Sequence, residues 1–280
     1  MQALALPAPA KLNLFLHILG KREDGYHNIQ TAFQFIDWCD ELTFHLRDDS
    51  EIRFTSNLSN IPEENNLVVR AAKCFQKESN CHRGVDIDLK KLIPIAAGLG
   101  GGSSDAATTL LALNALWEVS MPLEYLLEIG ATLGADVPIF IHGHAAWAEG
   151  IGNELTSMNF PEHWYVLLAP PVHVSTKLLF NDPRLTRDSA ALTISRYHSG
   201  EGHNDFEKLL RFEYREIAHA LDWLGQFGKA CVTGSGGVVF AGFDTQGEAG
   251  TIAAQAPSPL KAVVAKGFNQ SPLHRALKCF

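Results

Sequence analysis

The sequence has no surplus of basic residues and no long apolar run, and each absence excludes a class of protein. Its 280 residues include 23 Lys and Arg against 31 Asp and Glu, which gives a net charge of −8 with neutral histidines. A nucleic-acid polymer is bound through a surplus of basic side chains, so the acidic balance excludes nucleic acid as a partner. No apolar run approaches the roughly 18–20 residues of a membrane span, so we expect no membrane partner. A small phosphorylated ligand is still allowed, because backbone N–H groups hold phosphates without net positive charge.

Cysteine is scarce, and neither cysteine nor histidine has the spacing of a metal site. The five cysteines, an odd number without a C-x-x-C pair, are Cys39, Cys74, Cys81, Cys231 and Cys279. Such scattered thiols are typical of a reducing compartment. His142 and His144 form an isolated H-x-H, which we interpret as a strand or turn feature, and metal ligands stay unassigned. No Lys or Arg precedes the short apolar stretch at the N-terminus, so we expect no signal peptide and a cytoplasmic location.

Hydrophobic periodicity predicts interleaved strands and helices. Alternation over residues 12–18 predicts a half-buried strand whose polar face carries Lys11 and Asn13. Further strands are expected at Glu41–Leu46, Val85–Leu89, Val137–Ile141, Trp164–Leu168, Gly237–Ala241 and Lys261–Ala265. Helices are expected at Asn66–Lys77, Ser104–Trp117, Pro122–Leu133, Phe206–Phe227 and Gly247–Ala254. Because several strands follow one another directly, the order favours an α+β fold over a doubly wound parallel one.

Prolines just past mid-chain indicate a division into two lobes. They stand at Pro161 and at Pro170–Pro171. We place the boundary around Thr156–Pro161, which gives an N-terminal lobe of residues 1–157 and a C-terminal lobe of residues 158–280.

A glycine-dense segment at residues 94–107, PIAAGLGGGSSDAA, carries the strongest local signal. Its glycines are Gly98, Gly100, Gly101 and Gly102, and Ser103 and Ser104 are expected to cap the helix that follows. Glycine permits positive φ and lets a bulky anion approach the backbone, and a helix N-terminus adds unpaired N–H donors. A plain flexible turn does not need four glycines in five residues. We therefore predict a polyphosphate cradle.

This segment does not fit better-known phosphate or nucleophile motifs. A Walker A loop requires Lys after its last glycine, and none follows here. A dinucleotide fingerprint requires glycine where Ser103 stands, and a serine-hydrolase elbow requires glycine where Asp105 stands. The H-R-D and D-F-G signatures of protein kinases are missing as well.

Three other segments carry polar residues beside apolar runs. They are PAKLN with Lys11, LGADVPIF with Asp136, and KACVTGSGGVVF at residues 229–240. Taken alone, Lys11 is interpreted as a solvated strand lysine and Asp136 as a turn aspartate. The TGSGG segment is either a glycine-rich hairpin or a second ligand surface, and both interpretations stay open.

In this order, PAKLN, the 94–107 segment and TGSGG resemble the three motifs of the small-molecule kinases named for galactose, homoserine, mevalonate and phosphomevalonate. A closer similarity, to the isoprenoid branch of that superfamily, spans Pro9 to His274. It is carried by PAKLNLFLHILGKREDGYHNIQT, GLGGGSSDAA, LGADVPIF, HGHAAWAEG, FNDPRL and AKGFNQSPLH. The additional glycines Gly101 and Gly102 suit that branch and argue against mevalonate or homoserine kinase.

The resemblance implies a two-lobed α+β small-molecule kinase fold. Its N-terminal lobe would be like the second domain of ribosomal protein S5, and an α/β-plait-like C-terminal lobe would complete the cleft. It also implies ATP with Mg²⁺ as the donor, and transfer to the 2-hydroxyl of 4-diphosphocytidyl-2-C-methyl-D-erythritol in the non-mevalonate isoprenoid pathway. No sequence feature demands a second subunit, so we expect a monomer or weak homodimer.

Matched by position, Lys11 and Asp136 correspond to the catalytic pair of these kinases. An aspartate within about 3 Å of an alcohol can accept its proton, and a lysine can orient that aspartate. Whether Asp136 removes the proton outright or mainly positions the hydroxyl stays open, because phosphoryl transfer depends chiefly on positioning and charge stabilisation.

The resemblance also assigns residues to the two ligands. The substrate residues are Asn13, Tyr26, His27, Asp136, Thr176 and Phe180, of which Tyr26, His27 and Phe180 would hold the flat cytosine ring. The ATP residues are Lys91, Pro94, Gly98, Leu99, Gly100, Gly101, Gly102, Ser103 and Ser104. Asp105 is expected to point away from the triphosphate, where it caps the helix or approaches Mg²⁺.

Two alternatives stay open. One is a superfamily kinase with another acceptor, such as mevalonate or homoserine. The other is a nucleotide-binding regulatory or scaffold protein without turnover. The presence of both Lys11 and Asp136 argues against the second, because a protein without turnover has no chemical reason to keep the pair.

Overall fold

A computed structural model describes residues 3–58, 62 and 65–278 of the chain. Its strands are β1 (Ala3–Lys21), β2 (His27–Arg47), β3 (Ile52–Ser56), β4 (Gly84–Lys90), β5 (Ala146–Glu149), β6 (Glu154–Ser157), β7 (Trp164–Ala169), β8 (Cys231–Val232), β9 (Val239–Phe243) and β10 (Lys261–Phe268). Its helices are α1 (Leu67–Glu78), α2 (Gly101–Leu116), α3 (Leu123–Leu133), α4 (Val137–His142), α5 (Thr176–Asn181), α6 (Ile194–His198), α7 (Glu207–Glu213), α8 (Arg215–Leu224), α9 (Gln246–Ala253) and α10 (Pro272–Leu277).

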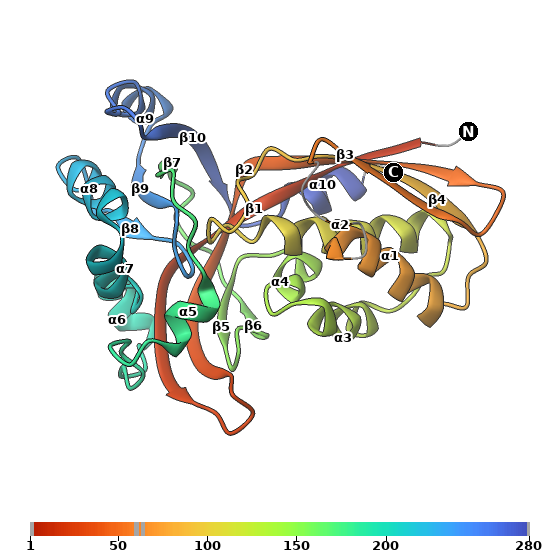
Figure 1. Cartoon of the computed structure of the whole chain (residues 1–280), viewed down its shortest axis with the longest axis horizontal. Helices are drawn as coiled ribbons and strands as arrows, with labels where there is room; N and C mark the ends of the chain where they lie inside the picture. Colours follow the sequence, from red (N-terminus) through yellow and green to blue (C-terminus); the bar gives the residue numbers. More distant parts are fainter. Residues whose placement is uncertain (1–2, 59–61, 63–64, 279–280) are drawn as a thin grey trace.

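One mixed sheet runs through the molecule in the order β3-β4-β2-β10-β7-β9-β8. The antiparallel hairpin of β1 and β2 is its longest unit, and Figure 1 shows this red and orange hairpin crossing the middle of the molecule. β3 pairs with β4 in parallel, whereas β10 is antiparallel to both β2 and β7. The structure therefore confirms an α+β fold with a mixed sheet.

The first core lies between the sheet and a layer of helices. α2 packs against α1, α3, α4 and β1, and its own Leu110 is 0% exposed, as are Phe44 and Phe75 in the same core. α10 returns from the end of the chain and places Leu273 in this same core. The helix that follows the glycine segment is thus fixed on several sides.

A second core joins β7 and β9 to α7, α8 and α9, at the opposite end of the view in Figure 1. Leu16 and Ile18 of β1 belong to it, although they stand near the start of the chain. The two cores therefore share the β1–β2 hairpin, and a boundary drawn at one point of the sequence does not separate them.

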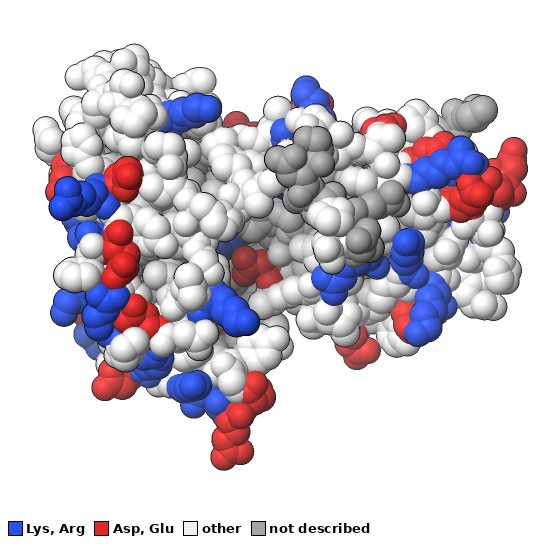
Figure 2. Space-filling model, in the orientation of Figure 1, with Lys and Arg blue, Asp and Glu red and all other residues white. Residues whose placement is uncertain are grey.

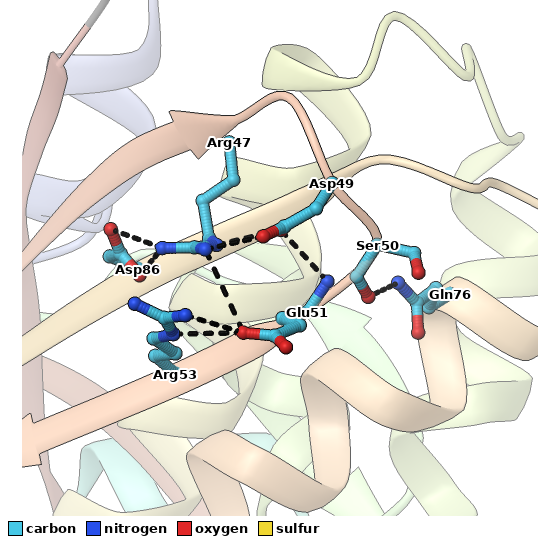
Figure 3. A network of polar contacts seen from close by, with 7 residues as sticks. All are labelled: Arg47, Asp49, Ser50, Glu51, Arg53, Gln76 and Asp86. Carbon is cyan, nitrogen blue, oxygen red and sulfur yellow. Dashed lines mark hydrogen bonds and ion pairs between the residues drawn. The ribbon is translucent and has the colours of Figure 1, made fainter.

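A network of charged side chains fixes the connection from β2 to β3. Arg47 of β2 donates to Asp86 of β4 at 2.9 Å and to Asp49 in the turn, and Arg53 pairs with Glu51 at 2.6 Å (Figure 3). The carbonyl oxygen of Ser50 also accepts a hydrogen bond from Gln76 of α1 at 3.0 Å. These contacts lie at the surface, so they define the turn and contribute little stability.

The expected strand at Val137–Ile141 was wrong, because these residues form helix α4. An apolar run of five residues is equally compatible with a buried helical turn. Pro138 stands in the first turn, where its missing N–H has no helical acceptor, and Gly143 ends the helix at φ +73°. Asp136 is therefore the N-cap residue of a short helix and does not precede a strand.

Two other expectations on helices need correction. The helix at Phe206–Phe227 is interrupted at Tyr214, whose backbone is extended at φ −127° and ψ 101° and separates α7 from α8. The helix expected from Ser104 begins at Gly101, with Gly100 as its N-cap, so Ser103 and Ser104 are first-turn residues.

None of the helices in the described part of the chain combines the length and apolar character that a bilayer crossing needs. Within residues 3–58, 62 and 65–278, no group of three or more His, Cys, Asp or Glu residues is placed to hold a metal ion. His142 ends α4, and His144 forms a single bridge with Gln270.

Candidate active site

A cleft of about 990 Å³ brings the sequence motifs together. In Figure 2 the middle of the displayed face is hollowed and mostly uncharged, with acidic atoms in its floor. The expected site residues that line the cleft are Lys11, Asn13, Tyr26, His27, Lys91, Pro94, Gly98, Leu99, Gly100, Gly101, Gly102, Ser103, Asp136, Thr176 and Phe180. Ser104 is 0% exposed in the helix and is not part of the lining.

Lys11 and Asp136 meet in this cleft. Nζ of Lys11 lies 3.5 Å from Oδ2 of Asp136, although 125 positions separate the residues in the sequence. The Lys11 side chain is 3% exposed, donates to the carbonyl oxygen of Gly98 at 3.0 Å and stands 5.3 Å from the ring centre of Phe33. Burial lowers the pKa of Lys11, and the charge of Asp136 opposes that shift. The solvated strand lysine expected from the isolated motif was therefore wrong.

The polar atoms of Asn13 hold Lys11 in place. Oδ1 of Asn13 accepts a hydrogen bond from Nζ of Lys11, and Nδ2 donates to Oγ1 of Thr31 at 2.9 Å. The backbone N–H of Asn13 donates to Oγ1 of Thr233, also at 2.9 Å. Asn13 therefore orients the lysine whatever else it contacts, and its role toward substrate stays a prediction.

The glycine segment is tightly folded where it passes Lys11. Gly98 has φ +76°, and a Cβ there would lie 2.2 Å from the carbonyl oxygen of Thr233. Gly100 has φ +70°, and a Cβ there would meet Phe140 at 2.9 Å. A side chain is excluded at both positions by conformation and by space, whereas a Cβ on Gly102 would meet its nearest neighbour at 3.6 Å.

The TGSGG segment is both a hairpin and a cleft surface. It connects β8 to β9, and Gly234 and Ser235 line the cleft. The N–H of Val238 donates to the carbonyl oxygen of Ala97 at 3.2 Å, so the two glycine segments lie against each other. Asn204, which the sequence motifs do not identify, donates from Nδ2 to the carbonyl oxygens of Val232 and Gly234, each at 2.8 Å.

An aromatic pair forms the opposite end of the cleft. The rings of His27 and Phe180 stack with centroids 4.8 Å apart and an angle of 24° between their planes. Nε2 of His27 is buried and has no hydrogen-bond partner among the described residues. Burial, with the charges of Arg187 and Lys21, lowers the pKa of His27, so its ring is neutral at pH 7.

Neighbouring contacts hold this aromatic pair open to the cleft. Arg187 donates to the carbonyl oxygen of Phe180 at 2.7 Å and to that of Asp182 at 2.6 Å, which fixes the end of α5. Thr176 at the start of α5 shares a hydrogen bond with Ser235. Tyr26 is 59% exposed and lies at the cleft rim.

Lys91 has a different environment from the other cleft residues. Its Nζ pairs with Asp40 at 2.5 Å and with Asp105 at 2.6 Å. Burial raises the pKa of Asp105 to about 7, against the lowering effect of Lys91. Asp105 therefore forms an ion pair with Lys91. This pairing was not predicted, because Asp105 was expected to cap the helix or to approach Mg²⁺.

Two family descriptions match the chain. Residues 66–144 match the GHMP kinases N terminal domain, and residues 189–262 match the GHMP kinases C terminal domain. A relative from Nitrosococcus oceani, named 4-diphosphocytidyl-2-C-methyl-D-erythritol kinase, is 51% identical over 270 residues, which are 96% of each chain. A relative of the same name from Pseudomonas aeruginosa (strain UCBPP-PA14) is 50% identical over 275 residues, 98% of each chain. The chain belongs to the 4-diphosphocytidyl-2-C-methyl-D-erythritol kinase family.

Solved structures agree with membership of this kinase family. A crystal structure of 4-(cytidine 5'-diphospho)-2C-methyl-D-erythritol kinase has a TM-score of 0.82 and 31% identity, and the match covers 94% of this chain and 99% of that one. A mevalonate kinase structure has a TM-score of 0.73 at 16% identity, covering 95% of this chain and 100% of that one, and shows the shared fold. The resemblance drawn from the motifs is confirmed, and the protein is a phosphotransferase of the GHMP kinase fold that uses ATP.

Proposed function

We propose that this kinase transfers the γ-phosphoryl group of ATP to the 2-hydroxyl of 4-diphosphocytidyl-2-C-methyl-D-erythritol. The observation that carries the proposal is the 3.5 Å contact of Lys11 with Asp136 in a cleft lined by the glycine segment. The names of the relatives supply the acceptor.

Each member of the pair has a defined task in this reaction. The acceptor oxygen forms its bond to the γ-phosphorus as the bond from that phosphorus to the β,γ-bridging oxygen breaks, and ADP leaves. Asp136 accepts the hydroxyl proton, and its side chain, 37% exposed, faces a cleft from which substrate enters. The contact with Asp136 favours the charged form of Lys11 against the effect of burial, and the ammonium group offsets the negative charge that develops during transfer.

The cytidine end of the acceptor fits the pocket of His27 and Phe180. A pyrimidine ring offers a flat face for stacking and polar edges for hydrogen bonds. The unpartnered Nε2 of His27 supplies one polar atom for such an edge, and Tyr26 at the rim supplies a second ring. Mevalonate and homoserine carry no aromatic group and leave this pocket unused, which favours the cytidine-linked acceptor.

The glycine segment suits the triphosphate of ATP. The first turn of α2 offers unpaired N–H groups beside Gly102, where the backbone is open to a large anion. Both carboxylates among the described lining residues already face a lysine, Asp105 beside Lys91 and Asp136 beside Lys11, so we propose that Mg²⁺ arrives on the phosphates of ATP. Mg²⁺ supplies charge neutralisation at the transferring group.

Lobe division, assembly and location complete the proposal. We assign residues 1–157 to a lobe with the glycine segment and the catalytic pair, and residues 158–280 to a lobe that completes the cleft. We also propose a monomer or weak homodimer, because one copy of the chain brings the motif residues together in one cleft. Cys39, Cys74, Cys81 and Cys231 are free thiols, which suits the reducing cytoplasm.

The test is an acceptor panel. Purified protein is incubated with ATP, Mg²⁺ and either the diphosphocytidyl methylerythritol, mevalonate or homoserine. ADP release is followed by a coupled assay, and the product is identified by ³¹P NMR. We expect a new phosphomonoester with the cytidine-linked acceptor only. Turnover of mevalonate or homoserine at a comparable kcat/KM would overturn the assignment, and ATP binding with no phosphorylated product would favour a non-catalytic protein.

A further inference from the structure

A buried cluster of three charged side chains lies behind the glycine segment. Asp40 comes from β2, Lys91 follows β4, and Asp105 lies in α2. Their side chains are 0%, 7% and 4% exposed, so the cluster is nearly closed to solvent. Nζ of Lys91 lies within hydrogen-bond distance of both carboxylates, at 2.5 and 2.6 Å.

Asp40 ties this cluster to the start of the glycine segment. Its Oδ2 holds Lys91, and its Oδ1 accepts the backbone N–H groups of Leu92 and Ile93 at 2.6 and 2.7 Å. Residues 91–93 are thereby fixed to β2, immediately before the segment reaches Pro94. The path of the chain into the glycine segment depends on this carboxylate.

Lys91 also forms part of the wall against which α2 begins. A Cβ on Gly101 would lie 2.9 Å from Nζ of Lys91 and 3.0 Å from Cγ2 of Ile93. Gly101 does not have positive φ, so its backbone conformation does not require glycine. Its lack of a side chain instead lets the first turn of α2 approach Lys91 and Ile93 closely. The ammonium group supports the first turn of the helix from behind.

The two buried carboxylates of the cluster keep the ammonium group of Lys91 in this position. The cluster contains two carboxylates for one ammonium, and burial raises the pKa of Asp105 to about 7. If Lys91 moved to contact a phosphate, Asp40 and Asp105 would be left buried without a counter-charge. A carboxylate that stays charged there would repel the polyphosphate, and one that takes up a proton would no longer hold the ammonium group that supports α2.

We propose that Lys91 is a positioning residue, which neutralises Asp40 and Asp105 and supports the first turn of α2 without contacting ATP. This inference rests on the proposed function only in taking ATP as the ligand of the glycine segment. It replaces the direct ATP-binding role that family resemblance gives to Lys91. The dependence of ATP affinity on Lys91 is then indirect and runs through the two carboxylates.

The test compares Lys91→Met with the double variant Lys91→Met/Asp105→Asn. A positioning role predicts that the double variant binds ATP more tightly than the single variant, whereas a direct phosphate contact predicts that it does not. The Kd for ATP is measured by titration calorimetry without acceptor, and KM for ATP and kcat are measured at pH 8. We expect Lys91→Met to raise the Kd and KM for ATP at least tenfold, with a smaller change in kcat. The double variant recovers at least threefold of that loss, because it removes a buried carboxyl group that the loss of Lys91 leaves without a cationic partner.

Lys90→Met is the matched control. Lys90 is the adjacent lysine, is 60% exposed and pairs at 3.2 Å with Glu41, which is 58% exposed. Its loss removes the same charge from the same stretch of chain at the surface, so the Kd for ATP should stay within twofold of the unmodified protein.

The proposal is overturned if the double variant binds ATP no better than Lys91→Met. That result is the one expected if Lys91 contacts a phosphate directly. If Lys91→Met does not fold, Asp105→Asn alone decides: we expect a lower Kd for ATP at pH 8, and a rise of tenfold or more contradicts the proposal. ATP binding is read without acceptor, so these outcomes are independent of the acceptor panel.

Discussion

Burial governs the protonation of the charged groups around the cleft. It lowers the pKa of Lys11 and His27 and raises that of Asp105. In each case removal from water disfavours the charged form, and only Lys11 and Asp105 have an opposite charge that opposes the shift. The cleft therefore combines a lysine whose charged form is favoured by a neighbouring carboxylate, a histidine that favours its neutral form, and a carboxyl group with a pKa of about 7.

The raised pKa of Asp105 predicts a pH-dependent contribution to stability. The pKa of Asp105 is about 7 in the folded state against 3.8 for a solvated aspartate, so the folded state binds the proton more tightly. This contribution is full below about pH 4 and is lost as the pH rises through 7. We expect the free energy of unfolding of the unmodified protein, relative to Asp105→Asn, to fall by about 1 kcal/mol or more between pH 5 and pH 8. Urea denaturation of both proteins at the two pH values measures it, and a constant difference contradicts the shift.

Phe180→Ala separates acceptor binding from chemistry. Loss of the ring that stacks on His27 should raise KM for the cytidine-linked acceptor about tenfold, because an aromatic contact and its buried area are lost. KM for ATP should be unchanged. Phe212→Ala is the control, since Phe212 is 75% exposed on α7 and contacts Arg184. Equal effects of the two substitutions on the acceptor KM would remove Phe180 from the site.

The side chains that we propose to contact ligands were easier to predict than the residues that hold those side chains in place. Lys11, Asp136 and Phe180 stand in motifs with recognisable neighbours. Asp40 and Asn204 have no such spacing signal, because their partners lie far away in sequence and are mainly backbone atoms. The aspartate at 40 and the Asn-Asp pair at 204–205 are polar residues beside apolar ones, which is compatible with many surface positions.

At the scale of elements, the two glycine segments act as one unit because each excludes side chains from the other. A Cβ on Gly98 would meet Thr233, and one on Gly237 would lie 3.1 Å from Cα of Ala97. The contact was not predictable from either motif, since 135 positions separate Gly98 from Thr233. Sequence patterns identified both loops, and only tertiary structure shows that they meet.

Gly98→Ala tests this contact. The substitution places a Cβ at φ +76° and against the carbonyl oxygen of Thr233, so the segments must separate. Backbone strain alone should lower the free energy of unfolding by about 1–3 kcal/mol, and ATP affinity should fall. Gly247→Ala in α9 is the control, because nothing lies within 4 Å of its Cβ and the helix favours alanine. Equal stability of the two variants would show that Gly98 tolerates a side chain.

Local signals such as a capping residue and a clear apolar face made some helices predictable from the sequence, and other helices lack them. α1 has an N-cap at Asn66, whose side chain accepts from the N–H of Val68 at 2.9 Å, and a clear apolar face, so its bounds were predicted closely. α4 has only five apolar residues before His142, and tertiary packing decides its form. Similarly, Tyr214 breaks the expected long helix through packing against the second core.

Across the whole molecule, the β1–β2 hairpin joins both cores. Ile18 of β1 is 0% exposed in the second core, while Leu6 of the same strand lies in the first. The prolines past mid-chain predicted two lobes but not this sharing, because each lobe was assigned from contiguous sequence. A continuous strand through both cores predicts one cooperative unit.

Ile18→Ala should therefore weaken the entire protein. Deletion of this buried side chain is expected to lower the free energy of unfolding by about 2–5 kcal/mol. Urea unfolding followed by tryptophan fluorescence and by far-ultraviolet circular dichroism should give coincident midpoints, both shifted to lower urea. Two separate transitions, with only one shifted, would show that the lobes unfold independently.

The most direct test of the account is the turnover of Asp136→Ala with ATP and the diphosphocytidyl methylerythritol, measured beside its Kd for ATP. The account predicts a kcat lower by about 10²–10⁴-fold, because the proton acceptor is lost, and an unchanged Kd, because Asp136 does not hold the triphosphate. A kcat close to that of the unmodified protein would contradict the assignment of the Lys11–Asp136 pair to phosphoryl transfer.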